Sequence, residues 1–271
     1  SPYLRTFRLA LESIELASEL FNFRKMNKNL DFVIPNYLGF CSQRSYLPKI
    51  YLTTSNFFPD PDPETTTTDG DVARLAVNEA FATIRGGAGT TASPAVAEGN
   101  VYLEATTTTD QYAALYRNID LFDTSSLTDT IIIDSATISL WGRAASETGL
   151  GDLNVNVYTS TPASNTNLVT ADYAQLGTTA QATAKATSTW TNGAYNDWTL
   201  NATGISNISL TGVSKFGFRS TNDADNSAPT WASAARTQIA HYNADQAGTT
   251  NDPKLAVTYT SEAENDYSYF L

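Results

Sequence analysis

Apolar and polar side chains alternate along much of the chain after about Asn56, and this period of two constrains the fold more than any other feature. Ala136, Ile138 and Leu140 occupy one phase of residues 135–140, and Ser or Thr occupies the other. Such alternation is typical of an antiparallel strand with one buried face. Further strands are expected at 101–104, 115–122, 153–157, 198–200, 215–220, 238–242 and 254–259. So many short strands without a long helix predict an all-β fold, an antiparallel β-sandwich or jelly roll.

The charged residues divide the sequence into two parts. Residues 1–55 contain seven Lys and Arg against four Asp and Glu, a net charge of +3, which leaves −15 for residues 56–271 out of a total of −12. The change falls just before three alternating prolines, which favour extended backbone and exclude a helix. The predicted organisation is an N-terminal helical or irregular anchoring segment at 1–56, a β-sandwich (jelly-roll) domain at 57–261 and a C-terminal tail at 262–271.

The first residues carry the signals of a helix. Ser1 is a good N-cap, and Pro2 suits the first helical position. Apolar side chains then recur at helical spacing, which predicts an amphipathic helix over about residues 2–25. Two alternatives stay open: the segment is an anchor, or it is a poorly ordered leader or translated sequence upstream of the true start. On the first alternative its apolar face makes the assembly contact, through Leu4, Phe7, Leu11 and Ile14.

The catalytic residue types are scarce. His241 is the only histidine and Cys41 the only cysteine. Ser-His-acid triads and Cys-His dyads need such a base, and metal sites with several histidines are excluded by the count. His241 shares its strand phase with Ile239, which favours a packed or interfacial histidine. We therefore expect no enzyme activity.

Acidic turns are the candidate metal sites. The stretches 60–64 and 222–226 alternate carboxylates with other residues, and oxygen ligands of this kind suit Ca²⁺. Neither stretch matches a complete calcium loop, and acids in turns also cap backbone groups. A structural calcium ion and backbone capping are therefore alternatives, and no other cofactor is expected. The candidate ligands are Asp60, Asp62, Glu64, Asp223 and Asp225.

Charge and aromatic residues bear on the partners. The net charge of −12 argues against nucleic acid. Arg, Glu or Asn interrupts the longest apolar stretches, so no membrane insertion is expected. Trp141 follows the polar phase of its strand, so an outward ring that stacks on a sugar is expected there.

Five stretches, in order along residues 57–260, carry a resemblance to a known family: DGDVAR at 69–74, YRNIDLFDTS at 116–125, ATISLWG at 136–142, YNDWTLN at 195–201 and ADQAGTTNDPKL at 244–255. Together they resemble the disaggregatase-related, DNRLRE-like β-sandwich modules of secreted surface proteins and of tailed-phage structural and fibre proteins. The resemblance implies a jelly-roll sandwich like that of carbohydrate-binding modules, without catalytic residues. Because one sandwich hosts many functions, it does not specify a role.

These observations favour a non-enzymatic virion structural protein, as a decoration, head-fibre or tail-fibre subunit. Its expected partners are other virion proteins or copies of itself, with surface glycans in addition. The alternatives are a secreted carbohydrate-binding or adhesion module and a subunit of an extracellular filament. In each case the expected location is a virion surface or the extracellular space.

Overall fold

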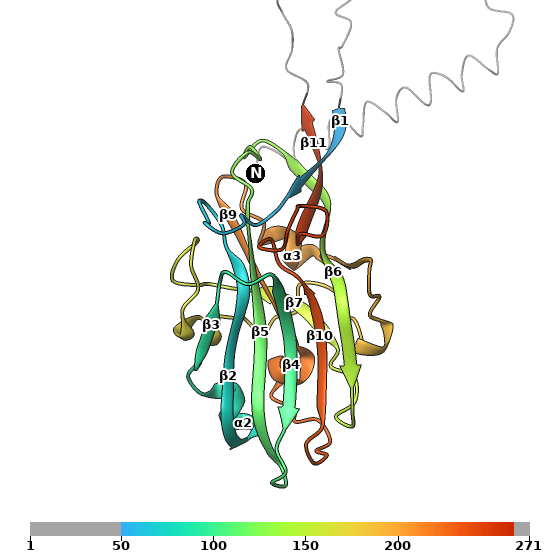
Figure 1. Ribbon diagram of the computed structural model, residues 1–271. Coiled ribbons are helices and arrows are strands. Elements are labelled where there is room, and N and C mark those ends of the chain that lie inside the picture. The colour runs from blue at the N-terminus through green and yellow to red at the C-terminus, as the bar shows by residue number, and fades with distance from the viewer. Residues whose placement is uncertain (1–49, 263–271) are drawn as a thin grey trace, which may run out of the picture. The chain divides into compact units, whose positions relative to one another are not determined.

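A computed structural model describes residues 50–262 of the chain (Figure 1). The helix expected over residues 2–25, with its contact residues Leu4, Phe7, Leu11 and Ile14, lies outside the described residues. So does nearly all of the expected C-terminal tail.

The described residues form an all-β sandwich, as the alternating pattern predicts. The helices are short: α2 (Phe81–Gly86), α3 (Ala202–Ser206), α4 (Thr221–Asp225) and the 3₁₀ turns η1 (Thr170–Ala174) and η2 (Thr187–Thr189). None of the helices in residues 50–262 has the length and apolar character that a membrane crossing requires. The strands are β1 (Ile50–Phe57), β2 (Asp69–Ala80), β3 (Thr91–Ser93), β4 (Glu98–Ala105), β5 (Gln111–Asp123), β6 (Ile132–Glu147), β7 (Val155–Thr159), β8 (Tyr195–Thr199), β9 (Val213–Ser220), β10 (Arg236–Tyr242) and β11 (Lys254–Glu262).

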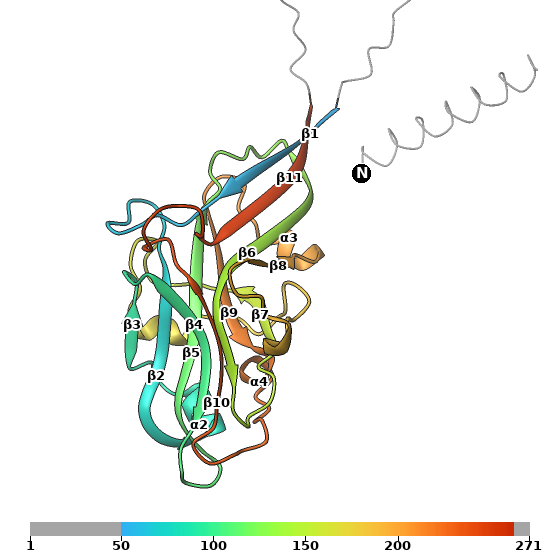
Figure 2. The same cartoon turned by 45° about the vertical axis from the view of Figure 1, so that its right-hand side comes forward.

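All pairings between these strands are antiparallel, and the main path runs β1-β11-β6-β10-β4-β5-β2-β3. One layer contains β3, β2, β5, β4 and β10, and β7, β8 and β9 lie behind it (Figures 1 and 2). Two long strands connect the layers. The first half of β5 pairs with β4 and its second half with β9, while β6 pairs first with β11 and β8 and then with β10.

Apolar side chains from both layers fill the interior around Trp198 of β8. This side chain is 1% exposed, and its ring packs edge-on against Phe218 at 5.0 Å between centroids. Its indole Nε1 donates to the Val155 carbonyl at 3.2 Å, so the one polar atom of the ring is satisfied. Ile138 and Leu140 of β6 are fully buried, which confirms the alternation expected for this strand.

The sandwich begins earlier than the sequence indicated. Strand β1 starts at Ile50 and pairs with β11 along its whole length, from Ile50 opposite Glu262 to Phe57 opposite Leu255. Residues 50–56 therefore belong to the sheet and not to a separate N-terminal segment, so the predicted boundary at 56/57 is too late. The apolar pattern missed β1 because it is an edge strand with several exposed side chains, Leu52 among them at 68%.

Candidate functional site

An open hollow of about 170 Å³ lies on the layer that contains β4, β5 and β10. Tyr102 of β4 and Tyr116 of β5 stand opposite each other in the ladder, with ring centroids 5.6 Å apart in an edge-to-face arrangement. Gln238 of β10 is the partner of Tyr102 on the other side. Asn100, two residues before Tyr102 on the same face of β4, completes the lining. Two half-buried aromatic rings and two side-chain amides thus share one face of the sheet.

Asp71 of β2 fixes the Asn100 side of this hollow. Its Oδ1 accepts from the Asn100 backbone N–H at 2.8 Å, and its Oδ2 accepts from Asn100 Nδ2 at 3.0 Å. Burial raises the pKa of Asp71 to about 7, although hydrogen bonds from Asn100 and Asn118 oppose the rise. The Nδ2 group of Asn100 has two protons, and only one of them can bond Asp71 Oδ2. The second proton and Oδ1 of Asn100 can therefore donate to and accept from a ligand.

Tyr102 contributes a neutral phenol to the hollow. Burial, followed by the neighbouring Glu104 carboxylate, raises the pKa of Tyr102 far above its ordinary value. The hydroxyl therefore stays protonated and can both donate and accept a hydrogen bond. Aromatic rings beside a few placed polar groups are the usual composition of a small-molecule site. This arrangement suits a neutral polyol such as a sugar, whose faces are apolar and whose edge carries hydroxyls.

Trp141 does not line this hollow. It lies on β6 opposite Tyr195 of β8, and the two rings pack edge-to-face at 5.0 Å. Lys254 Nζ lies 4.3 Å from the Tyr195 centroid, and the Tyr195 hydroxyl donates to the carbonyls of Thr250 and Asp252. Trp141 is half-buried within this packed group. Tyr195 therefore partly covers the ring of Trp141, which was expected to face outward. The sequence pattern did not identify Tyr102 and Tyr116 in the other layer. Tyr102 alternates with Val101 and Leu103, so the period of two contained the signal.

A larger open hollow of about 480 Å³ lies where the end of β6 meets η2. Its carboxylates already have partners. Glu147 Oε1 accepts from the backbone N–H of Gly151 at 2.8 Å, and Asp152 accepts from the backbone and hydroxyl of Ser188. No aromatic residue is among those that line it. We therefore regard the tyrosine hollow as the candidate binding site.

The acidic loop at 60–64 caps its own backbone. Oδ2 of Asp60 accepts from the backbone N–H groups of Thr65, Thr66 and Thr67 and from the hydroxyls of Thr65 and Thr66, at 2.6–3.2 Å. Burial raises the pKa of Asp60, but the hydrogen bonds of the threonines outweigh it and lower the pKa to about 2. Glu64 accepts from the Thr68 hydroxyl at 3.3 Å. These hydrogen bonds are those of the backbone-capping alternative. Asp62 donates its backbone N–H to Oδ1 of Asp245 at 2.6 Å.

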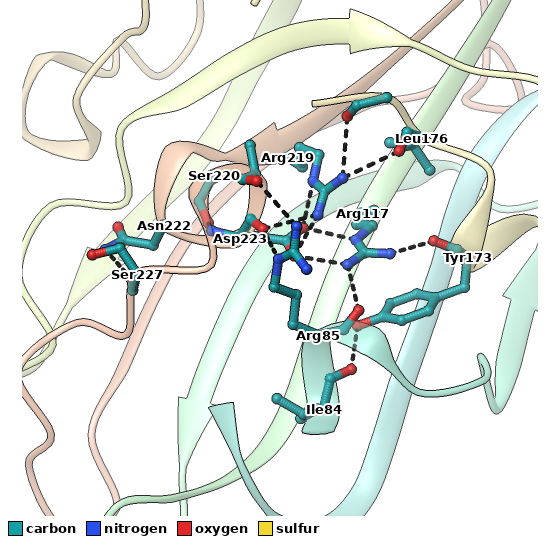
Figure 3. Close-up of polar contacts among 12 residues, drawn as sticks. Ile84, Arg85, Arg117, Tyr173, Leu176, Arg219, Ser220, Asn222, Asp223 and Ser227 are labelled. Carbon is teal, nitrogen blue, oxygen red and sulfur yellow. Dashed lines mark hydrogen bonds and ion pairs between the residues drawn. The ribbon is translucent and has the colours of Figure 1, made fainter. Parts of the chain in front are cut away.

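Three arginines surround Asp223 (Figure 3). Arg117 of β5 and Arg219 of β9 each donate two hydrogen bonds of 2.7 Å to its carboxylate, and Arg85 of α2 is 3.8 Å away. Burial acts to raise the pKa of Asp223, but the charges and hydrogen bonds of Arg117 and Arg219 hold it below its ordinary value. Asp223, a candidate calcium ligand in the sequence, thus has both carboxylate oxygens bonded to guanidinium groups. Asp225, at the end of α4, is exposed and does not take part in these ion pairs.

His241 is packed inside the sandwich, as its phase predicted. The side chain is fully buried, opposite Gly99 of β4. Burial lowers the pKa of His241 to about 3, although the neighbouring Asn243 side chain opposes this. A neutral ring with no access to solvent is a structural histidine.

No protein-family model matches the sequence, and no curated protein matches it significantly. Within residues 50–262, no group of three or more His, Cys, Asp or Glu is arranged to hold a metal ion. Fold and site together define the class as an all-β sandwich protein with an open, tyrosine-lined hollow on one layer.

Proposed function

We propose that the protein is a non-enzymatic structural subunit that displays the sandwich on a virion surface, as a decoration, head-fibre or tail-fibre protein. The pairing of Ile50 with Glu262 carries this proposal. Both strands that lead out of the described residues meet there, so the chain enters and leaves the sandwich at one place, which we call the terminal end. The loop between β4 and β5 lies at the opposite end (Figure 1). Attachment at the terminal end would leave that loop and the tyrosine hollow free.

Exposed apolar side chains near the terminal end support an interface there. Leu52 of β1 is paired with Thr260 of β11, and Thr260 is paired with Ile132 of β6. Leu52 is 68% exposed and Ile132 is 70% exposed, the highest values among the exposed large apolar side chains of the described part. Thr260 lies between the two side chains, which face the same side of the sheet, so a partner bound at the terminal end could cover both.

The oligomeric state of the full chain tests this proposal. Light scattering after gel filtration should give an assembly for residues 1–271 and a monomer for residues 48–262. Leu11→Asp and Ile14→Asp, on the expected apolar helix face, should weaken the assembly, whereas Glu15→Gln should leave it unchanged. A full chain that stays monomeric at high concentration would contradict the proposal. Mass spectrometry of purified virions would test the setting itself.

The tyrosine hollow favours a second candidate function, that of a carbohydrate-binding or adhesion module. Tyr102 and Tyr116 offer ring faces, and Asn100 and Gln238 offer amides, which together match the apolar face and hydroxyl edge of a sugar. A glycan array followed by titration calorimetry identifies and quantifies a ligand. Tyr102→Ala and Tyr116→Ala should each weaken binding at least tenfold, and Trp141→Ala should leave it unchanged. Loss of binding only in Trp141→Ala would instead restore the site expected from the sequence.

A further inference from the structure

Asp69 of β2 and Asp120 of β5 face each other in a buried part of the sheet, on the face of β5 that also carries Asn118 and Tyr116. They are direct partners in the antiparallel ladder, which places their Cα atoms about 4.5–5.5 Å apart with both side chains on one face. Both side chains have no solvent exposure. Burial and mutual repulsion make two adjacent ionised carboxylates costly, and the pKa of each is raised accordingly, by burial first and then by neighbouring acids.

The oxygens of this pair lack donors. Both oxygens of Asp120 and Oδ1 of Asp69 have no hydrogen-bond partner, and Oδ2 of Asp69 accepts from the Ala244 backbone N–H at 2.8 Å. Asn118 provides an independent sign. It is fully buried two residues before Asp120, on the same face of β5, and its Nδ2 donates to the carbonyl of Gly70 at 3.0 Å, beside Asp69. Its Oδ1 is also without a partner.

Another fully buried carboxylate has a different environment. Asp223 receives four hydrogen bonds from Arg117 and Arg219. Among the ion pairs of the described residues, none involves Asp69 or Asp120. Buried charges are normally paired or bound to a metal. The contrast points to a positive charge that the side chains themselves do not supply.

We propose that Asp69, Asp120 and Asn118 form a buried site for a hard divalent cation, Ca²⁺. Their four unpartnered oxygens are the ligand type that Ca²⁺ takes, and two carboxylates balance its charge. The set contains two acids and one amide, so it agrees with the lack of a three-acid group in residues 50–262. Asp71 is left out of the set, because Asn100 already donates to both of its oxygens. Main-chain carbonyls or waters complete the six to eight positions that the ion requires.

A cation here would join separate parts of the chain. Asp69 lies at the start of β2, Asn118 and Asp120 lie in the second half of β5, and Ala244 belongs to the connection between β10 and β11. The ion would therefore stabilise the folded state by binding it in preference to the unfolded chain. Its role is independent of the proposed display and sugar-binding functions.

Metal analysis and thermal unfolding of the full chain test the site. Protein dialysed against EGTA and titrated with CaCl₂ should bind one Ca²⁺ per chain by calorimetry. Saturating Ca²⁺ should raise the Tm by about 5 °C or more over the EGTA sample. An unchanged Tm together with no bound Ca²⁺ would overturn the proposal.

Asp120→Asn separates a metal site from a general stability effect. The amide keeps the shape and removes one charge, so the Ca²⁺-dependent rise in Tm should be lost, while the Tm in EGTA should match or exceed that of the parent chain. Asp129→Asn, at an exposed acid, should keep the full response to Ca²⁺. The alternative is that Asp69 and Asp120 share a proton. In that case neither EGTA nor Ca²⁺ would change the Tm, and the Tm would fall as the pH rises from 5 to 8. That result would exclude the cation site.

Discussion

Arg117 and Asp223 are separated by 106 residues in the sequence and form a two-point ion pair inside the sandwich, with Nε–Oδ2 and Nη2–Oδ1 distances of 2.7 Å. Arg117 also donates to the carbonyls of Tyr173 and Arg85, and its guanidinium lies 3.9 Å from the Tyr173 ring centroid. Arg219 binds the same carboxylate from β9. The ion pairs of this one carboxylate on α4 therefore join β5 and β9, and Arg117 extends the network to α2 and η1.

The first prediction concerns this ion pair. Arg117→Met should lower the free energy of unfolding by about 3 kcal/mol or more, because it removes two of the bonds to a fully buried carboxylate and leaves backbone carbonyls without donors. Urea unfolding followed by tryptophan fluorescence measures the change.

A surface arginine provides the matched control. Arg143 pairs with Glu98 at 2.6 Å, but the two side chains are 44% and 41% exposed. Arg143→Met should therefore cost less than about 1 kcal/mol. Equal losses in the two variants would mean that the buried network is no stronger than an ordinary surface pair.

The second prediction concerns His241, whose pKa burial lowers from 6.5 to about 3. Below pH 6.5 the unfolded chain binds a proton that the folded chain does not. The contribution of His241 to stability should therefore decrease as the pH falls from about 6.5 towards 3, by up to about 1.4 kcal/mol per pH unit. Because the chain has one histidine, its imidazole Cε1 NMR signal is unambiguous. That signal should not shift between pH 8 and 5 in the folded protein, and should titrate near pH 6.5 in urea. A midpoint near 6.5 in the folded state would show that the ring reaches solvent.

The third prediction concerns Asp60, whose pKa is lowered to about 2 by the net effect of its hydrogen bonds over burial. A carboxylate with a lowered pKa adds stability above its unfolded pKa of about 4, and that stability is lost as the pH falls through 2. Asp60→Ala should cost about 1 kcal/mol at pH 7, a value reduced by solvent screening, and less at pH 2. Asp62→Ala in the same loop should cost little at either pH, because its contact to Asp245 uses the backbone N–H. Urea unfolding at both pH values measures these losses. Equal losses of stability in the two variants would contradict this interpretation.

The sequence predicted the strands whose side chains alternate, and it failed where buried positions are polar. Ala136, Ile138 and Leu140 are buried in β6 as expected. Strand β2 was not expected, because it starts with Asp69 and Asp71, and an aspartate in the sequence does not indicate a buried strand position. Period-two reasoning assumes that polar side chains face water. A buried carboxylate violates this assumption, and its partners cannot be recognised until the fold brings them together.

The same limit applies to the sites. Asp223 looked like a turn acid because its nearest partner in sequence, Arg219, is four residues away and its other partner, Arg117, lies on a distant strand. The spacing of four residues between Arg219 and Asp223 was the available signal. Tyr102 and Tyr116 carry outward phases in their strands, but their pairing depends on the register of β4 with β5. Register between strands follows from the whole fold and not from either strand alone.

The last prediction concerns two neighbouring phenylalanines at the end of β1. Phe57 is 8% exposed and belongs to the hydrophobic core, whereas Phe58 is 41% exposed. If β1 is part of the sandwich, Phe57→Ala should lower the free energy of unfolding by about 3 kcal/mol, and Phe58→Ala should lower it by less than about 1 kcal/mol. Truncation gives a second measurement. Residues 48–262 should unfold in one cooperative transition, because β1 still covers the edge of β11. Residues 58–262 should be less stable and prone to aggregate, since the N–H and C=O groups of β11 that β1 occupied are then free to pair with another chain. Equal stability of the two truncated chains, with equal effects of the two phenylalanine substitutions, would return residues 50–57 to a separate N-terminal segment.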